Sequence, residues 1–173
     1  MTQAASRIVH PLEPLWDAQS RVLILGTMPS PRSRAAGFYY AHPQNRFWRT
    51  LAAVFDEPVP QTTAERQAFA HRHHIALWDV LHACDICGAA DDTIRAPEVN
   101  DFRPLLQRAP IRLIATTGST AARLYRRCAL PQTGREALAL PSTSPANCRW
   151  YTQARLIEAY RVLRPVCDAA PEQ

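Results

Sequence analysis

The residue types best suited to chemistry gather between residues 26 and 48. The segment begins with the tight turn Gly26-Thr27-Met28-Pro29-Ser30, and it continues through Tyr39 and Tyr40 to the amide side chain of Asn45. Aromatic faces stack on nucleic-acid bases at about 1–3 kcal/mol per base, and amides hydrogen-bond base edges. These residue types favour a site that binds a base.

All of the cationic side chains are arginine, and they exceed the acids by 20 to 15, a formal charge of +5. The absence of lysine excludes an enzyme that forms a Schiff base through a lysine amine, and it excludes phosphate loops that need lysine. No acid occurs between Asp17 and Asp56 or between Glu136 and Glu158. These stretches carry Arg21, Arg32, Arg34, Arg46, Arg49, Arg149 and Arg155. Positive potential attracts phosphates, so both stretches are candidate edges of a nucleic-acid groove; arginines on an ordinary solvated face are the alternative.

Short apolar runs predict four strands, at residues 21–25, 75–80, 111–116 and 137–140. Helical patterns between them predict an α/β fold, a three-layer sandwich with a central, mainly parallel four-stranded sheet. Ligands of such sheets bind beyond the carboxyl ends of the strands. The loops after the first and last strands, 26–43 and 141–147, lie in the acid-free stretches, which favours the groove.

Apolar spacing and capping residues predict helices over residues 45–55, 62–73, 100–106, 120–128 and 150–163. A capping box of Thr62 and Glu65 marks the start of the second. Phe47 and Trp48 have the spacing of core residues in the first helix. The two tyrosines that precede it lie beside Gly37 and are expected outside the core.

Two longer motifs resemble the uracil-DNA glycosylase superfamily. The run Ala41-His42-Pro43-Gln44-Asn45-Arg46-Phe47-Trp48 resembles the mismatch-specific uracil-DNA glycosylases. The turn at residues 26–30, together with Leu140-Pro141-Ser142-Thr143-Ser144-Pro145-Ala146-Asn147, is more similar to the hypoxanthine-DNA glycosylase branch, as are residues 78–81 and 100–102. The resemblance covers about residues 20–165.

The resemblance implies an enzyme that flips a deaminated base out of DNA and cleaves its N-glycosidic bond, hypoxanthine first and xanthine or uracil behind it. It implies that Asn45 is the catalytic residue and that Tyr40 stacks on the flipped base. The other residues at the base would be Gly26, Thr27, Met28, Pro29 and His42. Contacts to DNA would come from Ser30, Arg46, Ser142, Thr143, Ser144, Pro145, Asn147 and Arg149.

Two positions depart from the superfamily pattern. Met28 stands where most members have a water-activating Asp or Asn, and a thioether is only a weak hydrogen-bond acceptor. Leu140 stands where the second motif usually opens with His or Asn, which steadies the leaving base. Efficient uracil excision by those two polar groups is therefore not expected, and a mechanism centred on Asn45 remains. The alternative role of Asn45 is that of a helix N-cap.

An asparagine stabilises charge by hydrogen bonds but is not a general base near neutral pH. Positioning and electrostatics are thus the expected source of catalysis. Because no lysine amine is present to cleave the strand, the expected product is an abasic site left by a monofunctional enzyme.

Three other functions stay open. The first is mismatch-type excision of uracil or thymine. The second is a catalytically silent nucleic-acid-binding relative, which Met28 and Leu140 favour. The third is an oxidoreductase, because Cys84-Asp85-Ile86-Cys87 has the spacing of a thioredoxin-like pair.

The length of 173 residues predicts a single domain over residues 1–173, with its core at about 20–165. No apolar run approaches the roughly 20 residues of a membrane span, and no signal peptide is visible. Five cysteines without framework spacing predict reduced thiols in a cytoplasmic protein. We expect a monomer whose partner is DNA, with no membrane contact and no metal or cofactor. Three further assignments rest on weaker signals. His73 and His74 are assigned to a solvated helix end, and Asp79 is assigned to the cap of the next turn. Ser142 and Ser144 are assigned to phosphate contacts.

Overall fold

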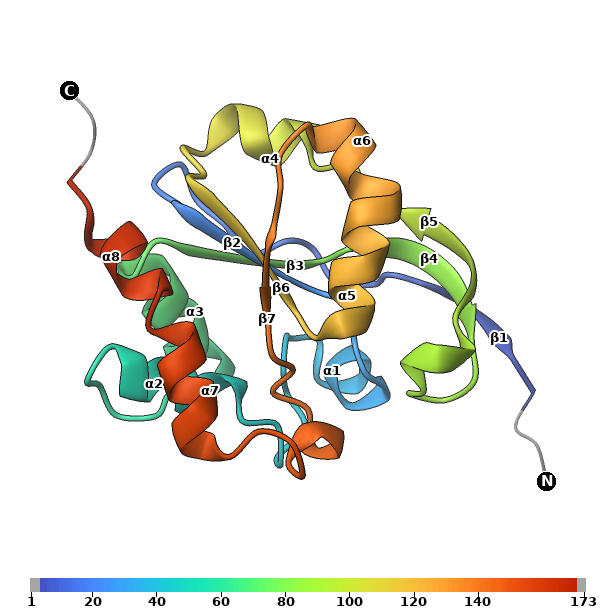
Figure 1. Cartoon of the computed structure of the whole chain (residues 1–173), viewed down its shortest axis with the longest axis horizontal. Helices are drawn as coiled ribbons and strands as arrows, with labels where there is room; N and C mark the ends of the chain where they lie inside the picture. Colours follow the sequence, from blue (N-terminus) through green and yellow to red (C-terminus); the bar gives the residue numbers. More distant parts are fainter. Residues whose placement is uncertain (1–3, 171–173) are drawn as a thin grey trace.

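The computed structural model describes residues 4–170, and its centre is a parallel sheet of four strands in the order β3-β2-β6-β7 (Figure 1). The strands run over Val22–Gly26 (β2), Ile75–Asp79 (β3), Leu113–Thr117 (β6) and Leu138–Leu140 (β7). The predicted α/β architecture and its four strands are confirmed, with boundaries displaced by one or two residues.

The sheet separates two apolar clusters because successive side chains of a strand point to opposite faces. In β2, Val22 and Ile24 pack into one cluster, whereas Leu23 and Leu25 pack into the other, and all four are fully buried. A strand buried on both faces needs such a continuous apolar run. The result is the expected three-layer sandwich.

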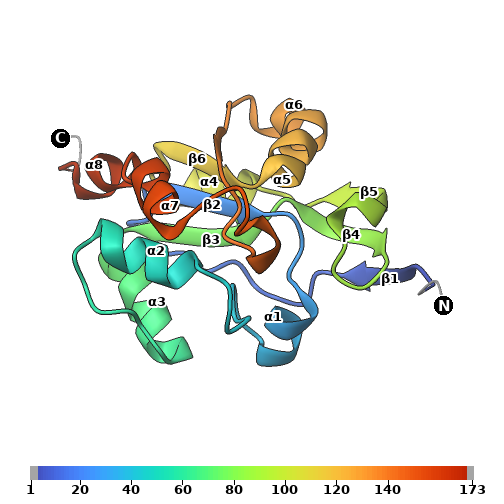
Figure 2. The ribbon, with the colours of Figure 1, turned by 60° about the horizontal axis from the view of Figure 1, so that its bottom comes forward.

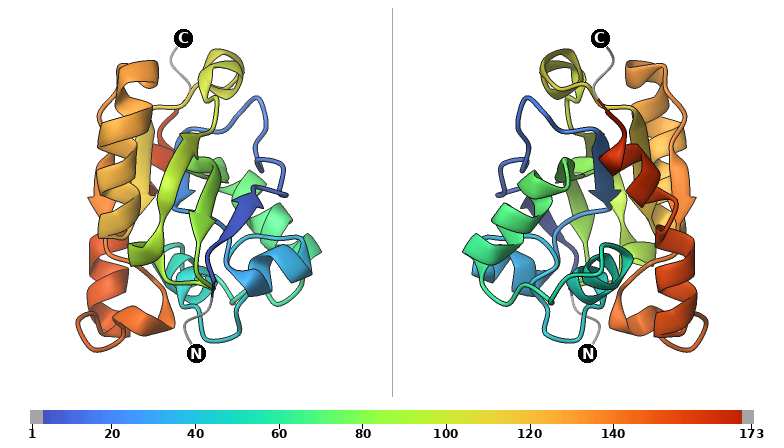
Figure 3. Two further views of the ribbon diagram at one scale, coloured as in Figure 1. Left: turned by 90° about the vertical axis from the view of Figure 1, so that its right-hand side faces the viewer. Right: turned by 90° about the vertical axis from the view of Figure 1, so that its left-hand side faces the viewer.

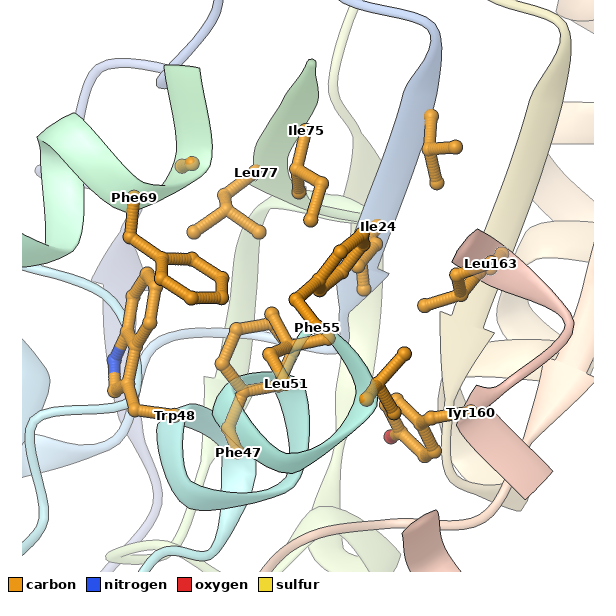
Figure 4. Close-up of a cluster of buried hydrophobic side chains, with 14 of the residues drawn as sticks. Ile24, Phe47, Trp48, Leu51, Phe55, Phe69, Ile75, Leu77, Tyr160 and Leu163 are labelled. Atoms are coloured by element: carbon orange, nitrogen blue, oxygen red, sulfur yellow. The ribbon is translucent and has the colours of Figure 1, made fainter. Parts of the chain in front are cut away.

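One helical layer contains α2 (Phe47–Val54), α3 (Thr63–Arg72), α7 (Gln153–Tyr160) and α8 (Leu163–Asp168). Figure 4 shows its core, where Phe47 and Tyr160 lie close to Ile24 of the sheet. Phe47 and Trp48 are buried, as expected. The other layer contains α4 (Arg103–Arg108), α5 (Ser119–Leu124), a π-helical turn at Tyr125–Ala129 and α6 (Leu130–Thr133). Figure 2 shows α2 and α3 below the sheet and α5 and α6 above it.

Helix ends follow local chemistry. The Thr62–Glu65 capping box is present, with each side chain accepting from the other residue's backbone N–H at 3.1 Å. The helix predicted over 120–128 widens into the π-helical turn ahead of Pro131. The helix predicted over 150–163 ends at Tyr160, and α8, which contains Pro165, follows it. Each proline lacks the N–H that a regular helix needs at that position.

A second, antiparallel sheet lies beside the first and was not expected from the sequence. Its strands β1 (Ser6–Val9), β4 (Leu81–Ile86) and β5 (Arg95–Val99) pair in the order β1-β4-β5, and the left view of Figure 3 looks onto it. The short helix α1 (Pro31–Ala36) is also additional, and Ser30 caps it. Among residues 4–170, no helix has the length and apolar character to cross a membrane.

Candidate active site

A cavity of about 560 Å³ opens at the carboxyl ends of the parallel strands. Gly26, Asp79 and Thr117, which end β2, β3 and β6, line it. The loops after β2 and β7 form further walls, together with the turn between β4 and β5 that contains the 3₁₀ helix η1 (Asp91–Thr93). Parallel α/β sheets bind ligands at this edge, and the volume suits a small ligand or a single base.

The cavity brings together most of the residues that the sequence assigns to a site. Its lining includes Asn45 and all of the residues expected at the base, namely Gly26, Thr27, Met28, Pro29, Tyr40 and His42. Among the expected DNA contacts it includes Ser30, Ser142, Thr143, Ser144 and Asn147. Arg46, Pro145 and Arg149 do not line it.

The Asn45 side chain is fixed through its oxygen. Its Oδ1 accepts a hydrogen bond from the Phe47 backbone N–H at 2.9 Å, and it accepts another from the Thr143 hydroxyl at 2.8 Å. The N-cap of α2 is Arg46, so Asn45 lies one residue before the cap, and its bond to Phe47 closes a local turn ahead of the helix. Because both bonds use Oδ1, the NH₂ group is the part of the amide that can serve a ligand in the cavity, and it offers only donors.

Tyr40 is an aromatic platform at the wall of the cavity. Its ring stacks on Phe47, with ring centroids 3.7 Å apart and an angle of 10° between the planes. Its hydroxyl lies 3.3 Å from Thr117 Oγ1, and burial raises the pKa of that hydroxyl well above its ordinary value. Tyr40 therefore stays neutral and is positioned from behind by a core side chain.

Tyr39 was expected outside the core and is instead buried. Its ring packs against the edge of Phe38, and its hydroxyl donates to the Glu13 backbone oxygen at 2.8 Å. The hydroxyl thus has a partner inside the fold, which makes burial of a tyrosine favourable.

Asp79 was expected to cap a turn, and that expectation is wrong. The residue is buried at the floor of the cavity, where its Oδ2 lies 2.7 Å from His10 Nε2. The His10 side chain is only 1% exposed, so the pair is shielded from solvent. Asn100 holds the corner by donating to the backbone oxygens of Asp79 and Leu81 at 2.9 and 3.0 Å.

Gly26 allows the Asp79 carboxylate to reach this position. A Cβ atom on Gly26 would collide with Asp79 Oδ1 and would lie 3.5 Å from the Tyr40 hydroxyl oxygen. The glycine of the first motif is therefore required by a close approach, and not by an unusual backbone angle.

Asp91 is a second carboxyl group in the cavity, which the sequence gave no reason to single out. It lies in η1 and interacts with the Thr27 hydroxyl. Burial raises the pKa of Asp91 above its ordinary value, and the nearby Asp79 and Asp92 carboxylates raise it further. Its position depends on how β4 turns into β5, and no motif marks that turn.

The loop after β7 is tied to the rest of the site by buried polar groups. Arg46 was expected to contact DNA, but it is only 7% exposed and donates from Nη1 to the Tyr151 backbone oxygen at 2.5 Å. Its own backbone N–H donates to the Thr143 oxygen at 3.1 Å. Arg46 therefore holds the loop after β7 in place from inside the fold. This structural role replaces the expected contact with DNA.

Ser142 and Ser144 act as turn residues in the same loop. Ser142 Oγ accepts from the Ser144 N–H, and Ser144 Oγ caps the 3₁₀ helix η3 (Pro145–Asn147). Asn147 donates to the Ser142 backbone oxygen at 2.9 Å. Arg149 is exposed beside Trp150, which is 70% exposed at the rim of the cavity.

The cysteine pair does not favour the oxidoreductase alternative, and His73 differs from its expected role. Cys84 is fully buried in β4, and burial raises the pKa of its thiol, which disfavours the nucleophilic thiolate of an oxidoreductase. His73 was assigned to a solvated helix end, but it stacks on Phe55 at 4.0 Å and its Nε2 lies 2.8 Å from Glu57 Oε1. No group of three or more His, Cys, Asp or Glu residues within 4–170 has the arrangement of a metal site.

Known proteins share both the sequence and the shape of this chain. A family model described as the uracil DNA glycosylase superfamily matches residues 14–164. A protein of Methanosarcina acetivorans named hypoxanthine DNA glycosylase is 35% identical over 136 residues, which is 78% of this chain and 85% of the relative. A protein of the same name from Methanosarcina barkeri is 33% identical over 138 residues, 79% of this chain and 86% of the relative.

A solved structure is similar as well. The solution NMR structure of a Methanosarcina acetivorans protein, described as a candidate uracil DNA glycosylase, matches with a TM-score of 0.74 and 30% identity. The match covers 94% of this chain and 99% of that protein.

Proposed function

This chain belongs to the uracil DNA glycosylase superfamily and is a DNA glycosylase, and from that premise we propose that it excises deaminated bases, hypoxanthine first and xanthine or uracil behind it. The name of the two similar proteins supports hypoxanthine. In the proposed reaction, the damaged nucleotide is flipped into the cavity and its N-glycosidic bond is hydrolysed.

The observation that carries the proposal is the fixed orientation of Asn45. When an N-glycosidic bond breaks, the sugar gains positive charge and the leaving base gains negative charge. The Asn45 NH₂ group, with Oδ1 held by Phe47 and Thr143, donates a hydrogen bond to the departing base. A donor held in place before the reaction contributes about 2.7–4 kcal/mol to transition-state stabilisation in enzymes that use this device.

Tyr40 supplies the stacking surface in this proposal. A base that enters the cavity packs against its ring, which Phe47 supports from the other side. Stacking of this kind is worth about 1–3 kcal/mol per base and is indifferent to base identity. Discrimination therefore has to come from polar groups.

The Asp79 carboxylate favours hypoxanthine over adenine and uracil over cytosine. Hypoxanthine and uracil carry a ring N–H where adenine and cytosine carry a lone pair. Carboxylate oxygens accept hydrogen bonds, so Asp79 at the cavity floor favours the N–H edge and repels the lone pair. His10 fixes the orientation of the carboxylate.

The outer rim of the cavity contacts the DNA backbone. Phosphate contacts come from Ser30, Ser142, Ser144, Asn147 and Arg149, and the exposed ring of Trp150 lies next to the last of these. Hydroxyl, amide and guanidinium groups are the usual donors to phosphate oxygens. The chain contains no lysine, so no lysine amine is present to form the Schiff base of a strand-cleaving enzyme, and the product in this proposal is an abasic site.

The direct test uses end-labelled duplexes that contain a single hypoxanthine, xanthine, uracil, thymine or apurinic site. The expected result is release of hypoxanthine and strand breaks that appear only after alkali. Nicking without alkali would reject the monofunctional reaction. Release of uracil or thymine from mismatches without release of hypoxanthine would favour mismatch-type excision, and binding without release of any base would favour a silent relative.

A further inference from the structure

Release of a purine places a demand on the site that Asn45 does not meet. As the bond from the sugar to purine N9 breaks, the electron pair stays on the base, and a proton delivered to N7 neutralises it. An amide donates a hydrogen bond but does not transfer a proton. The inference below rests on the proposed function and concerns the group that supplies this proton.

Few groups that line the cavity are suited to give up a proton. Burial raises the pKa of the Tyr39 and Tyr40 hydroxyls well above their ordinary values, so neither is a ready acid. His42 Nδ1 is already engaged, because it accepts a hydrogen bond from the Gln44 N–H at 3.1 Å. Three carboxyl groups line the cavity, those of Asp79, Asp91 and Asp92. Asp92 is exposed to solvent, which leaves Asp79 and Asp91 in the sheltered part of the cavity.

The two carboxyl groups have different surroundings. Asp79 lies against His10, a group able to carry the compensating charge, and the pair is buried. Asp91 interacts instead with the neutral hydroxyl of Thr27, while the carboxylates of Asp79 and Asp92 act on it with like charge. When two carboxyl groups share a cavity, the one without a cationic partner retains its proton more readily.

The other groups around Asp91 do not change which of the two carboxyl groups retains its proton more readily. The Cys84 thiol is buried behind it and stays neutral, because burial raises the pKa of that thiol. The cation that shares the cavity lining is Arg34, whose Nη1 donates to the Pro29 backbone oxygen at 3.1 Å. Burial outweighs these neighbours and raises the pKa of Asp91.

Asp91 and Asn45 line the same cavity from different segments of the chain. In Figure 1 the green turn that carries η1 and the dark orange loop that carries η3 lie on either side of α1, and both contribute to the cavity lining. A base held in this cavity is therefore surrounded by a lining that includes both the Asn45 amide and the Asp91 carboxyl.

We propose that Asp91 is the general acid of the reaction, which protonates N7 of the departing purine. The C1′–N9 bond breaks with its electron pair going to the purine, and the Asp91 carboxyl transfers its proton to N7. Water adds its hydroxide to C1′, and the proton left from that water restores Asp91 through solvent. Neutral hypoxanthine and an abasic site are the products, so atoms and charge balance.

The test compares single-turnover excision of hypoxanthine by the wild type, Asp91→Asn, Asp91→Glu and Glu158→Gln between about pH 5 and pH 9. Glu158→Gln is the control, because it removes one negative charge from an exposed residue that does not line the cavity. Binding to a duplex with an uncleavable 2′-fluoro hypoxanthine nucleotide separates affinity from chemistry. Thermal unfolding checks that each variant folds.

We expect Asp91→Asn to lower the wild-type rate about 100-fold at pH 6, in the range of general acid catalysis, with affinity changed less than about twofold. The wild-type rate should fall as pH rises, because the acid loses its proton, whereas the Asp91→Asn rate should be flat. Asp91→Glu should recover part of the rate and its pH dependence, and Glu158→Gln should match the wild type.

Two results would overturn the inference. One is an Asp91→Asn rate within about twofold of the wild type, and the other is a fall in rate with rising pH that persists in this variant. A wild type that releases uracil but no hypoxanthine at any pH would reject the proposed substrate as well, so the two failures are distinguishable.

Discussion

The Thr143 hydroxyl donates a 2.8 Å hydrogen bond to Asn45 Oδ1 across 98 residues of sequence. This bond joins the loop after β7 to the start of α2, and it determines which end of the amide is left for a substrate. Both groups lie in the acid-free stretches of the chain. Because Oδ1 is held in this way, the NH₂ group of Asn45 is left as a fixed hydrogen-bond donor.

Removing this bond should weaken catalysis more than folding. Thr143→Val keeps the side-chain shape, and we expect it to lower the rate of hypoxanthine excision about tenfold and stability by about 1 kcal/mol. Single-turnover excision and urea unfolding measure the two effects. Thr116→Val is the control, because the buried Thr116 hydroxyl makes no hydrogen bond within the described residues. Thr143→Val acting at the wild-type rate would show that the bond does not position Asn45.

The parallel sheet was predictable because its evidence is local. Apolar runs such as residues 22–25 indicate a strand buried on both faces, and Gly26 marks its end. The loops that follow the first and last strands could be assigned to one edge because carboxyl ends of parallel strands lie together. That reasoning places Thr143 beside the loop that leads to Asn45, whereas the assignment of Asn45 itself rests on the family resemblance.

The carboxyl groups could not be placed in this way. Asp79 meets His10 across 69 residues, and only the unexpected antiparallel sheet brings the amino-terminal segment to that corner. The strand β5 contains Pro97 and is mostly exposed, and its pairing with β4 shifts register. Its sequence therefore shows no alternating apolar pattern that would predict a strand. The position of Asp91 depends on the turn between β4 and β5. Its acidic neighbourhood is typical of a solvated surface.

Gly26 and the Asp79 carboxylate approach each other closely at the cavity floor, so a single methyl group added at residue 26 should have a strong effect. Gly26→Ala places a Cβ against Asp79 Oδ1, and we expect a loss of about 1–3 kcal/mol in stability and loss of excision. Urea unfolding and single-turnover excision provide the readouts. Asp79→Ala is the control, because it removes the atom that would collide, so adding Gly26→Ala to that variant should cause no further loss of stability. Equal stability of Gly26→Ala and the wild type would contradict this packing.

If Tyr40 acts as a stacking platform, removal of its hydroxyl and removal of its aromatic ring should have different effects. Tyr40→Phe keeps the stacking on Phe47 and should excise hypoxanthine within about threefold of the wild-type rate. Tyr40→Leu removes the aromatic face and should weaken binding to an uncleavable hypoxanthine duplex about 10- to 100-fold, the range of base stacking. Equal binding by both variants would remove Tyr40 from the site.

Glu57 gives stability a pH dependence away from the cavity. Hydrogen bonds from Arg72, and to a smaller extent from His73, lower the pKa of the Glu57 carboxyl below its ordinary value of 4.5. The ionised form is therefore favoured in the folded state. Its contribution is present above that ordinary value and is lost as pH falls through the lower folded pKa.

Glu57→Gln should accordingly reduce the free energy of unfolding by about 0.5–1 kcal/mol at pH 7, a value limited by solvent screening of exposed Arg72. The difference from the wild type should shrink as pH is lowered toward about 3. Urea unfolding at both pH values tests this. Glu158→Gln, in an exposed pair with Arg161, should change stability little at either pH. A Glu57→Gln difference that is unchanged at low pH would rule out the ionised carboxylate as its source.

The most direct measurement of the central claim is single-turnover hypoxanthine excision by the wild type, Asn45→Asp and Asn45→Ala. Asn45→Asp keeps an oxygen for Phe47 and Thr143 but replaces the NH₂ donors with a second acceptor. If Asn45 acts as a donor to the leaving base, both variants should be at least about 100-fold slower than the wild type. An Asn45→Asp enzyme as fast as the wild type, or faster, would show that this position activates water as an acceptor, and it would contradict the account.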